Sequence, residues 1–267
     1  MLNPKWKAAV AGVAAAFMLS LPAVGAAAVE VDGVPLSGEE GWGHGGTSYV
    51  TLRALSSAGD YTLSWDGRQA TLAGDGMELI AVPGECYIEF NGRALYVAEG
   101  VGVLNGRTYL PLRVVAAATG GALSWDGERA VAGLTLEGAV APVADYDEQG
   151  LYWLSRIISA ESRGEPMAGQ IAVGNVVLNR VAHENYPDTI REVIFDTNYG
   201  VQFEPVSNGT ILHEPVERSV LAAKMVLEGA EVVEDCIYFY APALSPGTWI
   251  KGNAVYYTTI GCHRFYR

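Results

Sequence analysis

From Asp147 onward, the apolar residues of the chain follow the spacing of an α-helix. Leu151, Leu154 and Ile158 fall on one stripe of that helix, and Glu161 takes the next position of the same stripe. The spacing therefore predicts a helix that ends with a carboxylate on its apolar side.

Gly164 and Pro166 end this helix, because the glycine suits the left-handed position after a helix and the proline cannot continue the turn. The next segment, Met167–Ala182, is apolar on most of its faces and predicts a central, buried helix. Asn175 and Asn179 are its polar exceptions. We interpret Asn175 as structural, whereas Asn179 either lines a site or satisfies backbone groups.

The part of the chain before this region contains an internal duplication. Residues 47–70 recur as residues 107–130 at a fixed offset of 60, and both copies contain Leu-Arg and Ser-Trp-Asp-Gly. Each copy predicts a short strand (Ser48–Thr51 or Thr108–Leu110), a helical turn after the arginine, a strand ending at Trp-Asp-Gly, a turn and a further strand.

Residues 1–28 have the order of a secretory signal peptide. Lys5 and Lys7 precede an apolar run from Ala8 to Leu21, and alanines at 26–28 follow it. The run is shorter than the roughly 20 residues that span a bilayer as a helix. We therefore expect cleavage after Ala28 and a secreted protein without a retained membrane anchor.

The chain is acidic, with 17 lysines and arginines against 30 aspartates and glutamates, and a net charge of −13. Removal of Lys5 and Lys7 with the leader would make this −15. Such a charge argues against nucleic acid or an anionic membrane as a partner, and we attribute it to solubility. The roughly 240 residues after the leader are enough for two modest domains.

The duplicated half resembles the copper amine oxidase N-terminal domain, a stalk or wall-associated module of secreted bacterial proteins. The resemblance covers about residues 30–137, in a domain that we place at 29–137. This half holds one histidine, His44, and one cysteine, Cys86, which are too few ligands for copper or zinc. We therefore assign it no chemistry.

Trp65 and Trp125 occupy equivalent positions of the two repeats. Tryptophan is usually largely buried, so we interpret both as core residues rather than as platforms for sugars. A linker with glycine, proline and alanine follows at residues 138–147.

Glu161 has two physical reasons for a raised pKa. Burial on the apolar side of its helix disfavours the anion, and so does the partial negative charge of the last helix carbonyls. A glycosidase acid must be protonated near neutral pH, so this position suits that role. The structural alternative is an ion pair with Arg156, Arg163 or Arg180 that fixes the helix.

A series of short motifs runs through residues 148–267. They are Ala160-Glu161-Ser162-Arg163-Gly164-Glu165-Pro166, Gly169-Gln170, Ala172-Val173, Leu178-Asn179-Arg180-Val181, Gln202-Phe203, Pro205-Val206, Gly209-Thr210, Tyr238-Phe239-Tyr240, and Ile260-Gly261 with His263. In this order they closely resemble the SleB-type cell wall hydrolases, known as spore cortex-lytic enzymes.

That resemblance implies an α+β, lysozyme-like domain that cuts peptidoglycan between N-acetylmuramic acid and N-acetylglucosamine, often as a lytic transglycosylase. The family's catalytic glutamate falls on Glu161. The substrate is then the glycan strand of a vegetative wall or of a spore cortex during germination. We expect no metal and no cofactor, and the sequence identifies no regulatory partner.

Sugar recognition needs hydrogen-bonding groups beside flat apolar faces. Candidates for substrate contact are Asn179, Gln202, Phe203, Tyr238, Tyr240 and His263. Tyr238 and Tyr240 share one face of a strand and Phe239 takes the other, so only one of these faces can serve the site.

A second carboxylate would permit simple hydrolysis. The candidates are Glu165, Asp188, Asp196 and Glu204. We interpret Glu165 as a cap of the following helix. Glu204, which follows Gln202-Phe203, either faces Glu161 and activates a water or is a solvated loop residue.

The cysteines and histidines of this domain bear on disulfide pairing and on alternative functions for the protein. Cys236 and Cys262 form the one plausible disulfide of this domain, and their pairing is left open. A zinc peptidase lacks a second histidine after His183-Glu184. A cysteine amidase would need Cys262 as its nucleophile and His213 as the base that activates it. A non-catalytic wall-binding protein would need no catalytic residue at all.

Overall fold

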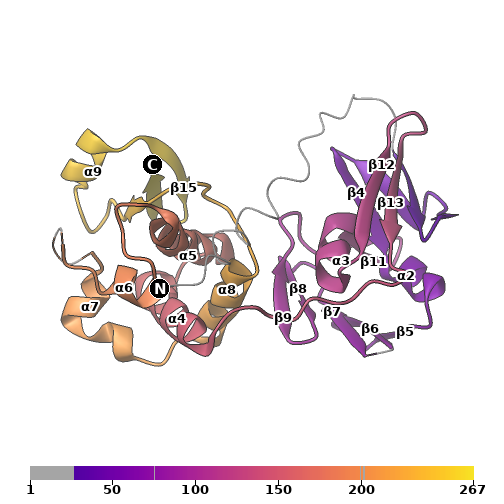
Figure 1. The fold of residues 1–267 in the computed structure, drawn as a ribbon, viewed down its shortest axis with the longest axis horizontal. Helices are drawn as coiled ribbons and strands as arrows, with labels where there is room; N and C mark the ends of the chain where they lie inside the picture. The colour runs from indigo at the N-terminus through magenta and orange to yellow at the C-terminus, as the bar shows by residue number, and fades with distance from the viewer. Residues whose placement is uncertain (1–26, 75, 199, 201) are drawn as a thin grey trace. The chain divides into compact units, whose positions relative to one another are not determined.

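The computed structural model describes residues 27–74, 76–198, 200 and 202–267, and it divides after Ala144 into two compact units (Figure 1). Nearly all of the predicted signal peptide, residues 1–26, lies outside the described residues. Ala28 already begins strand β1, so cleavage after Ala28 would remove the first residue of that strand.

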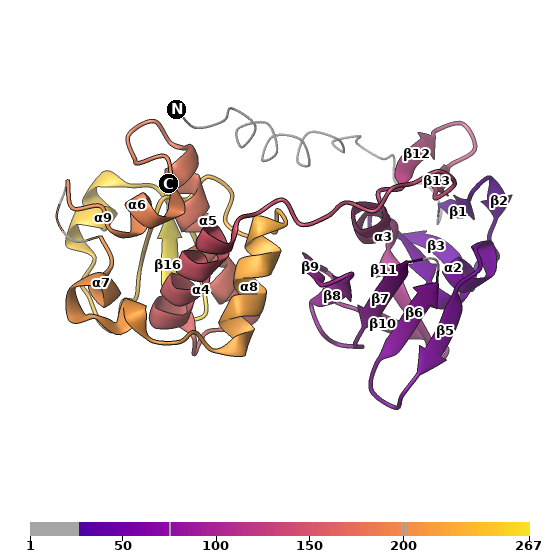
Figure 2. The ribbon, with the colours of Figure 1, turned by 60° about the horizontal axis from the view of Figure 1, so that its bottom comes forward.

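The N-terminal unit is built from β-sheets with two short helices, α2 (Leu52–Ala58) and α3 (Leu112–Thr119) (Figure 2). The strand orders are β12-β13-β1-β2, β10-β11-β4-β3 and β5-β6-β7-β8-β9. The strands are β1 (Ala28–Val31), β2 (Val34–Pro35), β3 (Gly41–His44), β4 (Thr47–Thr51), β5 (Thr62–Trp65), β6 (Ala70–Gly74), β7 (Met77–Ala81), β8 (Tyr87–Phe90), β9 (Arg93–Tyr96), β10 (Gly102–Leu104), β11 (Arg107–Pro111), β12 (Ala122–Asp126) and β13 (Val131–Thr135).

The duplication is visible in this unit. Strand, helix, strand, turn and strand recur as β4-α2-β5-β6 and as β11-α3-β12-β13, which confirms the predicted order. The equivalent strands β4 and β11 pair antiparallel with Val50 opposite Leu110, two residues that are 60 positions apart. The two copies therefore meet about a local two-fold axis at this pair, and both side chains enter the apolar core.

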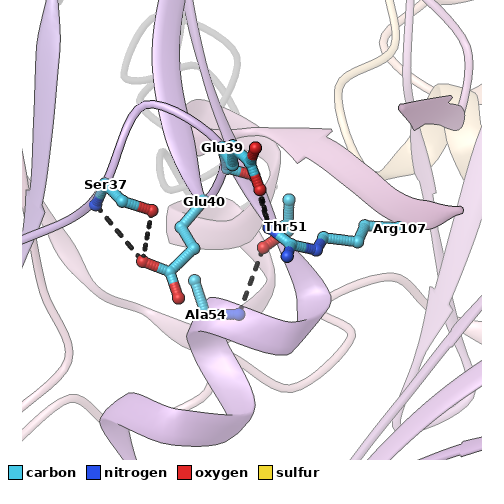
Figure 3. Close-up of polar contacts among 6 residues, drawn as sticks. All are labelled: Ser37, Glu39, Glu40, Thr51, Ala54 and Arg107. Atoms are coloured by element: carbon cyan, nitrogen blue, oxygen red, sulfur yellow. Dashed lines mark hydrogen bonds and ion pairs between the residues drawn. The ribbon is translucent and has the colours of Figure 1, made fainter. Parts of the chain in front are cut away.

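Polar contacts fix the start of the first copy (Figure 3). The Thr51 hydroxyl caps α2 by accepting a hydrogen bond from the Ala54 amide at 3.2 Å. In the preceding loop, the backbone amide and hydroxyl of Ser37 both donate to the Glu40 carboxylate. Arg107, from the second copy, forms an ion pair with Glu39 at 3.2 Å, so the loop before the first copy is tied to a strand of the second.

The core role predicted for the paired tryptophans is wrong for Trp65. This side chain is 56% exposed, and Trp125 is half-buried. The physical reason is their place in the sheets, because each lies on an edge strand immediately before a turn.

The C-terminal unit combines helices with a small antiparallel sheet of order β14-β16-β15, which confirms the α+β prediction. The predicted linker at 138–147 contains no helix or strand. The helices are α4 (Glu148–Ser162), α5 (Met167–Ala182), α6 (Ile190–Ile194), α7 (Glu204–Asn208), the 3-10 helix η1 (Thr210–Leu212), α8 (Glu217–Leu227) and α9 (Thr248–Asn253). The strands are β14 (Tyr238–Tyr240), β15 (Tyr256–Ile260) and β16 (His263–Tyr266).

Helices α4, α5 and α8 pack on one another and form the centre of this unit (Figure 2). Helix α5 spans the predicted residues, and its apolar side chains from Met167 to Val177 are buried except for the half-buried Ala168. The Asn175 amide donates to the Ala230 carbonyl at 2.7 Å and accepts from the Val232 amide at 2.9 Å, so its structural role is confirmed. None of the helices in the described part of the chain has the length and apolar character needed to cross a membrane.

The end of α4 differs from the prediction. The helix stops at Ser162, but Arg163 keeps right-handed helical angles and Gly164 has no positive φ. The chain turns instead through a hydrogen bond from the Glu165 amide to the Ser162 carbonyl at 2.8 Å. A left-handed glycine is therefore not what ends this helix.

Candidate active site

Glu161 is the second-last residue of α4 and lies on the stripe that carries the buried Leu154 and Ile158. Burial raises the pKa of its carboxyl group to about 7, with a smaller upward contribution from the negative charge of Glu204. The positive charge of Arg180 acts in the opposite direction. A carboxyl group in this state holds a proton for much of the time at neutral pH.

None of the three arginines that could have neutralised Glu161 forms an ion pair with it in the described part of the chain. Arg156 forms an ion pair with Glu214 at 2.6 Å, and Arg163 is exposed. The Arg180 Nε donates to the Ile237 carbonyl at 2.8 Å. Among the described residues, Glu161 forms no ion pair within 4.0 Å, so the structural alternative of a salt-bridged helix end does not hold.

Glu204 is the first residue of α7 and directly follows Phe203, which is buried. Its side chain is exposed, yet its charge reaches Glu161 strongly enough to disfavour the anion there. Of the carboxylates considered as a partner for Glu161, Glu204 is thus the one whose charge raises the pKa of Glu161, and it stands at the start of a short helix.

Aromatic rings surround Arg180 on this side of α5. Its guanidinium carbon lies 5.1 Å from the ring centre of Phe203, 5.3 Å from that of Tyr186 and 5.9 Å from that of Tyr238. Tyr186 is hydrogen-bonded to Tyr238, and burial together with this bond raises the pKa of Tyr186 to about 12. Two phenol groups therefore stand beside the buried cation.

The side chains of β14 alternate between the two faces of the sheet, and the candidate contacts Tyr238 and Tyr240 share one of them. Phe239 packs with tilted rings against Phe203 and Phe265 and meets His263 edge-on, so this face is turned toward the core. Tyr240 is buried against Tyr266. Tyr238 alone among the predicted strand residues lies beside Arg180, which is also one of the groups acting on Glu161.

His263 is packed in the core of this unit. It is 6% exposed, and burial lowers the pKa of its ring. Its Nδ1 lies 4.0 Å from the Glu165 carboxylate. The fold therefore gives His263 a packing position, and the substrate contact predicted for it stays a prediction.

Glu165 does not cap the helix that follows it, contrary to the prediction. No side chain caps the start of α5. The Glu165 carboxylate instead accepts a hydrogen bond from the backbone amide of Cys262 at 2.8 Å, across 97 positions of sequence. Gly261 completes this turn, because it has a φ of 58° and a Cβ there would lie 1.8 Å from the carboxylate.

Two further candidates are held by backbone groups. The Asn179 amide donates to the carbonyls of Glu234 and Cys236, which gives this residue the structural role that the sequence left open. The Gln202 amide donates to the Gly200 carbonyl at 3.0 Å, and its side chain is half-buried. Gln202 remains a predicted contact, since it lies two residues before Glu204.

The disulfide considered for Cys236 and Cys262 is not formed, and both thiols are free. Tyr238 pairs with Tyr266, so Cys236 lies near the end of β16, whereas Cys262 lies in the turn before its start. At about 3.3 Å per residue, the strand keeps them roughly 10 Å or more apart, beyond the reach of a disulfide.

Cys262 also has the wrong chemistry for an amidase nucleophile. Its hydrogen bond with Glu165 raises the pKa of the thiol, whereas a nucleophile needs a lowered one. His213, the partner that the alternative required, is exposed after η1.

Trp249 and Tyr186 were not among the predicted site residues. Trp249 is 61% exposed on α9 and meets Tyr238 edge-on at 5.5 Å between ring centres. Neither residue lies in a segment with a regular spacing of apolar residues, so the local sequence does not identify them as site residues. Their sequence signal is only that both are aromatic in loop-rich segments, which is the composition that sugar-binding surfaces use.

Comparison with known proteins assigns both halves of the chain. Residues 164–266 match the family described as Cell Wall Hydrolase. Residues 31–132 match the Copper amine oxidase N-terminal domain. Both resemblances that the sequence motifs indicated are thereby confirmed. The hydrolase match begins three positions after Glu161, so the role of that residue rests on its position and environment.

The C-terminal half is homologous to spore cortex-lytic enzymes. The enzyme of that name from Bacillus cereus is 31% identical over 105 residues, which are 39% of this chain and 39% of that protein. The one from Halalkalibacterium halodurans is 30% identical over 115 residues, 43% of this chain and 34% of that protein. The chain thus spans less than two fifths of the length of these relatives.

Among solved structures, the catalytic domain of the germination-specific lytic transglycosylase SleB from Bacillus anthracis is similar to this chain. The two are 29% identical, with a TM-score of 0.43, and the match covers 47% of this chain and 100% of that one.

Proposed function

We propose that this protein cleaves the glycan strand of peptidoglycan between N-acetylmuramic acid and N-acetylglucosamine, as a lytic transglycosylase with Glu161 as its acid and base. The observation that carries the proposal is the state of the Glu161 carboxyl group, which is half-buried, without an ion pair among the described residues, and raised in pKa to about 7 by desolvation. The homology to spore cortex-lytic enzymes supplies the substrate class.

One carboxyl group is sufficient for this reaction. Protonated Glu161 gives its proton to the glycosidic oxygen while the bond from that oxygen to the anomeric carbon breaks. The resulting carboxylate then takes the proton of the sugar's own 6-hydroxyl as that oxygen bonds to the anomeric carbon. The product carries a 1,6-anhydro ring, no water is consumed, and Glu161 ends the cycle protonated.

A pH profile tests the role of Glu161. Because the acid must be protonated at the start, the rate of release of soluble fragments from purified peptidoglycan should fall as the pH rises through about 7. A rate that stays constant from pH 6 to pH 9 would count against Glu161 as the acid. Loss of turbidity of the suspended wall material is a sufficient readout.

Glu204 is proposed as a neighbour that tunes Glu161. Its negative charge disfavours the Glu161 anion, so Glu204→Gln should lower the pKa of Glu161 and move the fall in activity to lower pH, by about 1 unit or less. Glu192→Gln, at an exposed residue of α6, is the control and should leave the profile in place. If Glu204 instead activates a water, its replacement would abolish products with reducing ends.

We further propose that the protein acts outside the cell membrane, at the cell wall or spore cortex. The predicted signal peptide and the names of the homologous enzymes support this location. Treatment of walls containing muramic lactam in parallel with walls lacking it separates the two substrates. Preferential release from the first would assign the protein to cortex.

A further inference from the structure

A row of tyrosines crosses one face of the small sheet in the C-terminal unit. Tyr238 on β14 pairs with Tyr266 on β16, and Tyr266 pairs with Tyr256 on β15. Directly paired residues point to the same face, so the three side chains form one row. The opposite face carries Phe239 and Phe265, which pack on the core beside α5. The tyrosine row therefore lies on the side of the sheet that faces away from α5.

Helix α9 adds an exposed tryptophan to this face. Trp249 meets the Tyr238 ring edge-on at 5.5 Å between ring centres and is 61% exposed. Both ends of the short helix are fixed. Gly247, with a φ of 56°, lies against the Tyr240 ring, where a Cβ would come within 2.5 Å of the ring carbons. At the other end, the Asn253 amide donates a hydrogen bond to the Trp249 carbonyl at 2.8 Å.

Tyr256 stands at the other end of the row and is 54% exposed. Its ring centre lies 5.6 Å from that of Tyr266. Since β16 separates β14 from β15, the two ends of the row are about 10 Å apart, which is two inter-strand spacings. Two large aromatic side chains are thus held in solvent on a fixed support, as in surfaces that bind a ligand. Flat apolar rings beside hydroxyl groups are the surface on which sugar rings stack.

Arg264 is the cation of this face. It is paired with Tyr240 across β14 and β16 and lies two residues before Tyr266, so its side chain points to the tyrosine side. The guanidinium is hydrogen-bonded to the phenol groups of Tyr240 and Tyr266, which hold it in place. Arg264 is exposed and forms no ion pair within 4.0 Å with any described acidic residue.

Arg267, three positions later, shows the contrast. It pairs with Glu234 and with Asp235, the latter at 2.6 Å. The acidic residues near the end of β16 therefore neutralise Arg267, whereas Arg264 keeps its charge. In a chain with 30 acidic residues and 17 basic ones, an exposed arginine without an acidic partner is complementary to a carboxylate from outside the protein.

We propose that the face formed by Trp249, Tyr238, Tyr256 and Arg264 is a binding surface for the glycan strand of peptidoglycan, in addition to the catalytic group. Sugar rings stack on the exposed aromatic side chains, and a carboxylate carried by the strand, from a lactyl group or a stem peptide, binds Arg264. The identity of the polymer rests on the proposed function. This face holds the polymer and takes no part in the proton transfers.

The test measures binding separately from cleavage. The full-length Glu161→Gln protein, which is expected not to cut the polymer, is mixed with insoluble purified peptidoglycan, and bound and free protein are separated by sedimentation. Adding Trp249→Ala or Tyr256→Ala should raise the Kd by roughly 2- to 10-fold, because each removes a stacking ring. Tyr152→Ala, at an exposed aromatic residue near the start of α4, is the control and should bind as its parent does.

The role of Arg264 is tested with a polymer that lacks carboxylates. Arg264→Gln should raise the Kd for peptidoglycan by roughly 2- to 5-fold and leave binding to insoluble chitin, a strand of N-acetylglucosamine, unchanged. Arg218→Gln, at an exposed arginine of α8, is the matched control. Peptidoglycan treated with an amidase loses its stem peptides and exposes lactyl carboxylates. An Arg264 effect on intact walls alone assigns the stem peptide, and an effect on treated walls alone assigns the lactyl group.

Unchanged binding of both Trp249→Ala and Tyr256→Ala would overturn the proposal. Loss of chitin binding in Arg264→Gln would overturn the carboxylate contact. Binding to phosphatidylglycerol vesicles that depends on Trp249, with peptidoglycan binding intact, would assign the face to a membrane instead. Should Trp249→Ala not fold, Tyr256→Ala decides. Cleavage is scored on the same variants with Glu161 present. Normal 1,6-anhydro products with no change in binding remove only this inference, whereas a protein that binds through this face and releases no fragments removes the proposed function.

Discussion

Replacement of Glu161 by glutamine is expected to lower the rate of peptidoglycan cleavage by roughly 10²- to 10⁴-fold, the usual contribution of a positioned general acid. Glutamine has nearly the same shape, so it can fill the same half-buried position at the end of α4. It carries no transferable proton, and both the donation to the glycosidic oxygen and the recovery from the 6-hydroxyl are lost. Release of soluble muropeptides, followed over time, measures the loss.

The matched control for this variant is Glu148→Gln, at the opposite end of the same helix. Glu148 lies in the first turn, far from the predicted chemistry, and its replacement should change the rate by less than about twofold. An active Glu161→Gln protein with an inactive Glu148→Gln protein would contradict the assignment. Full activity in both would favour a non-catalytic role for this part of α4.

Phe265→Ala is expected to destabilise the C-terminal unit by about 3–5 kcal/mol. Phe265 is fully buried on β16, where it packs with Phe239, His263 and the apolar face of α5. Removing the ring reduces the buried apolar area. It also leaves a cavity between the sheet and helix α5 that their movement does not fill. Urea denaturation of the full chain, followed through the transition of this unit, gives the change in unfolding free energy.

Val255→Ala is the control for that measurement. Val255 immediately precedes β15 in the same sheet region but is 70% exposed, so its truncation removes little buried area and should change the unfolding free energy by less than about 0.5 kcal/mol. Equal destabilisation by the two variants would mean that Phe265 does not form part of the core of this unit. A decrease in unfolding free energy for Phe265→Ala alone agrees with the buried position of Phe265.

The features that the sequence predicts well are those encoded locally. Helix α5 begins and ends at the predicted Met167 and Ala182, because a long apolar segment after a proline has few alternatives. The duplication fixes the order of elements in the N-terminal unit, and the stripe of α4 places Glu161 on the buried side. In each case the pattern lies within one element or repeats at a fixed interval.

The features that escaped prediction depend on contacts between distant segments. The Glu165 carboxylate accepts a hydrogen bond from the Cys262 amide, 97 positions along the chain, and no local pattern indicates that contact. The position of Glu165 just before a helix suggested a cap, which the structure does not contain. The aromatic surroundings of Arg180 come from the loop after α5, the start of α7 and strand β14. The exposure of Trp65 follows from an edge strand that only the sheet order reveals.

Glu204 lies between the features that local sequence predicts and those that depend on contacts between distant segments. Its sequence position left it either opposite Glu161 or in a solvated loop. The residue is exposed and its charge raises the pKa of Glu161, whereas activation of a water by Glu204 stays a prediction. Sequence periodicity could not decide this because α7 is a short helix of five residues between loops.

The most direct test of the central claim is mass spectrometry of the fragments that the wild-type full chain releases from purified peptidoglycan. A lone acid and base at Glu161 predicts muropeptides that end in 1,6-anhydro-N-acetylmuramic acid and that are absent when Glu161 is replaced by glutamine. Free stem peptides released from intact glycan strands would contradict the account.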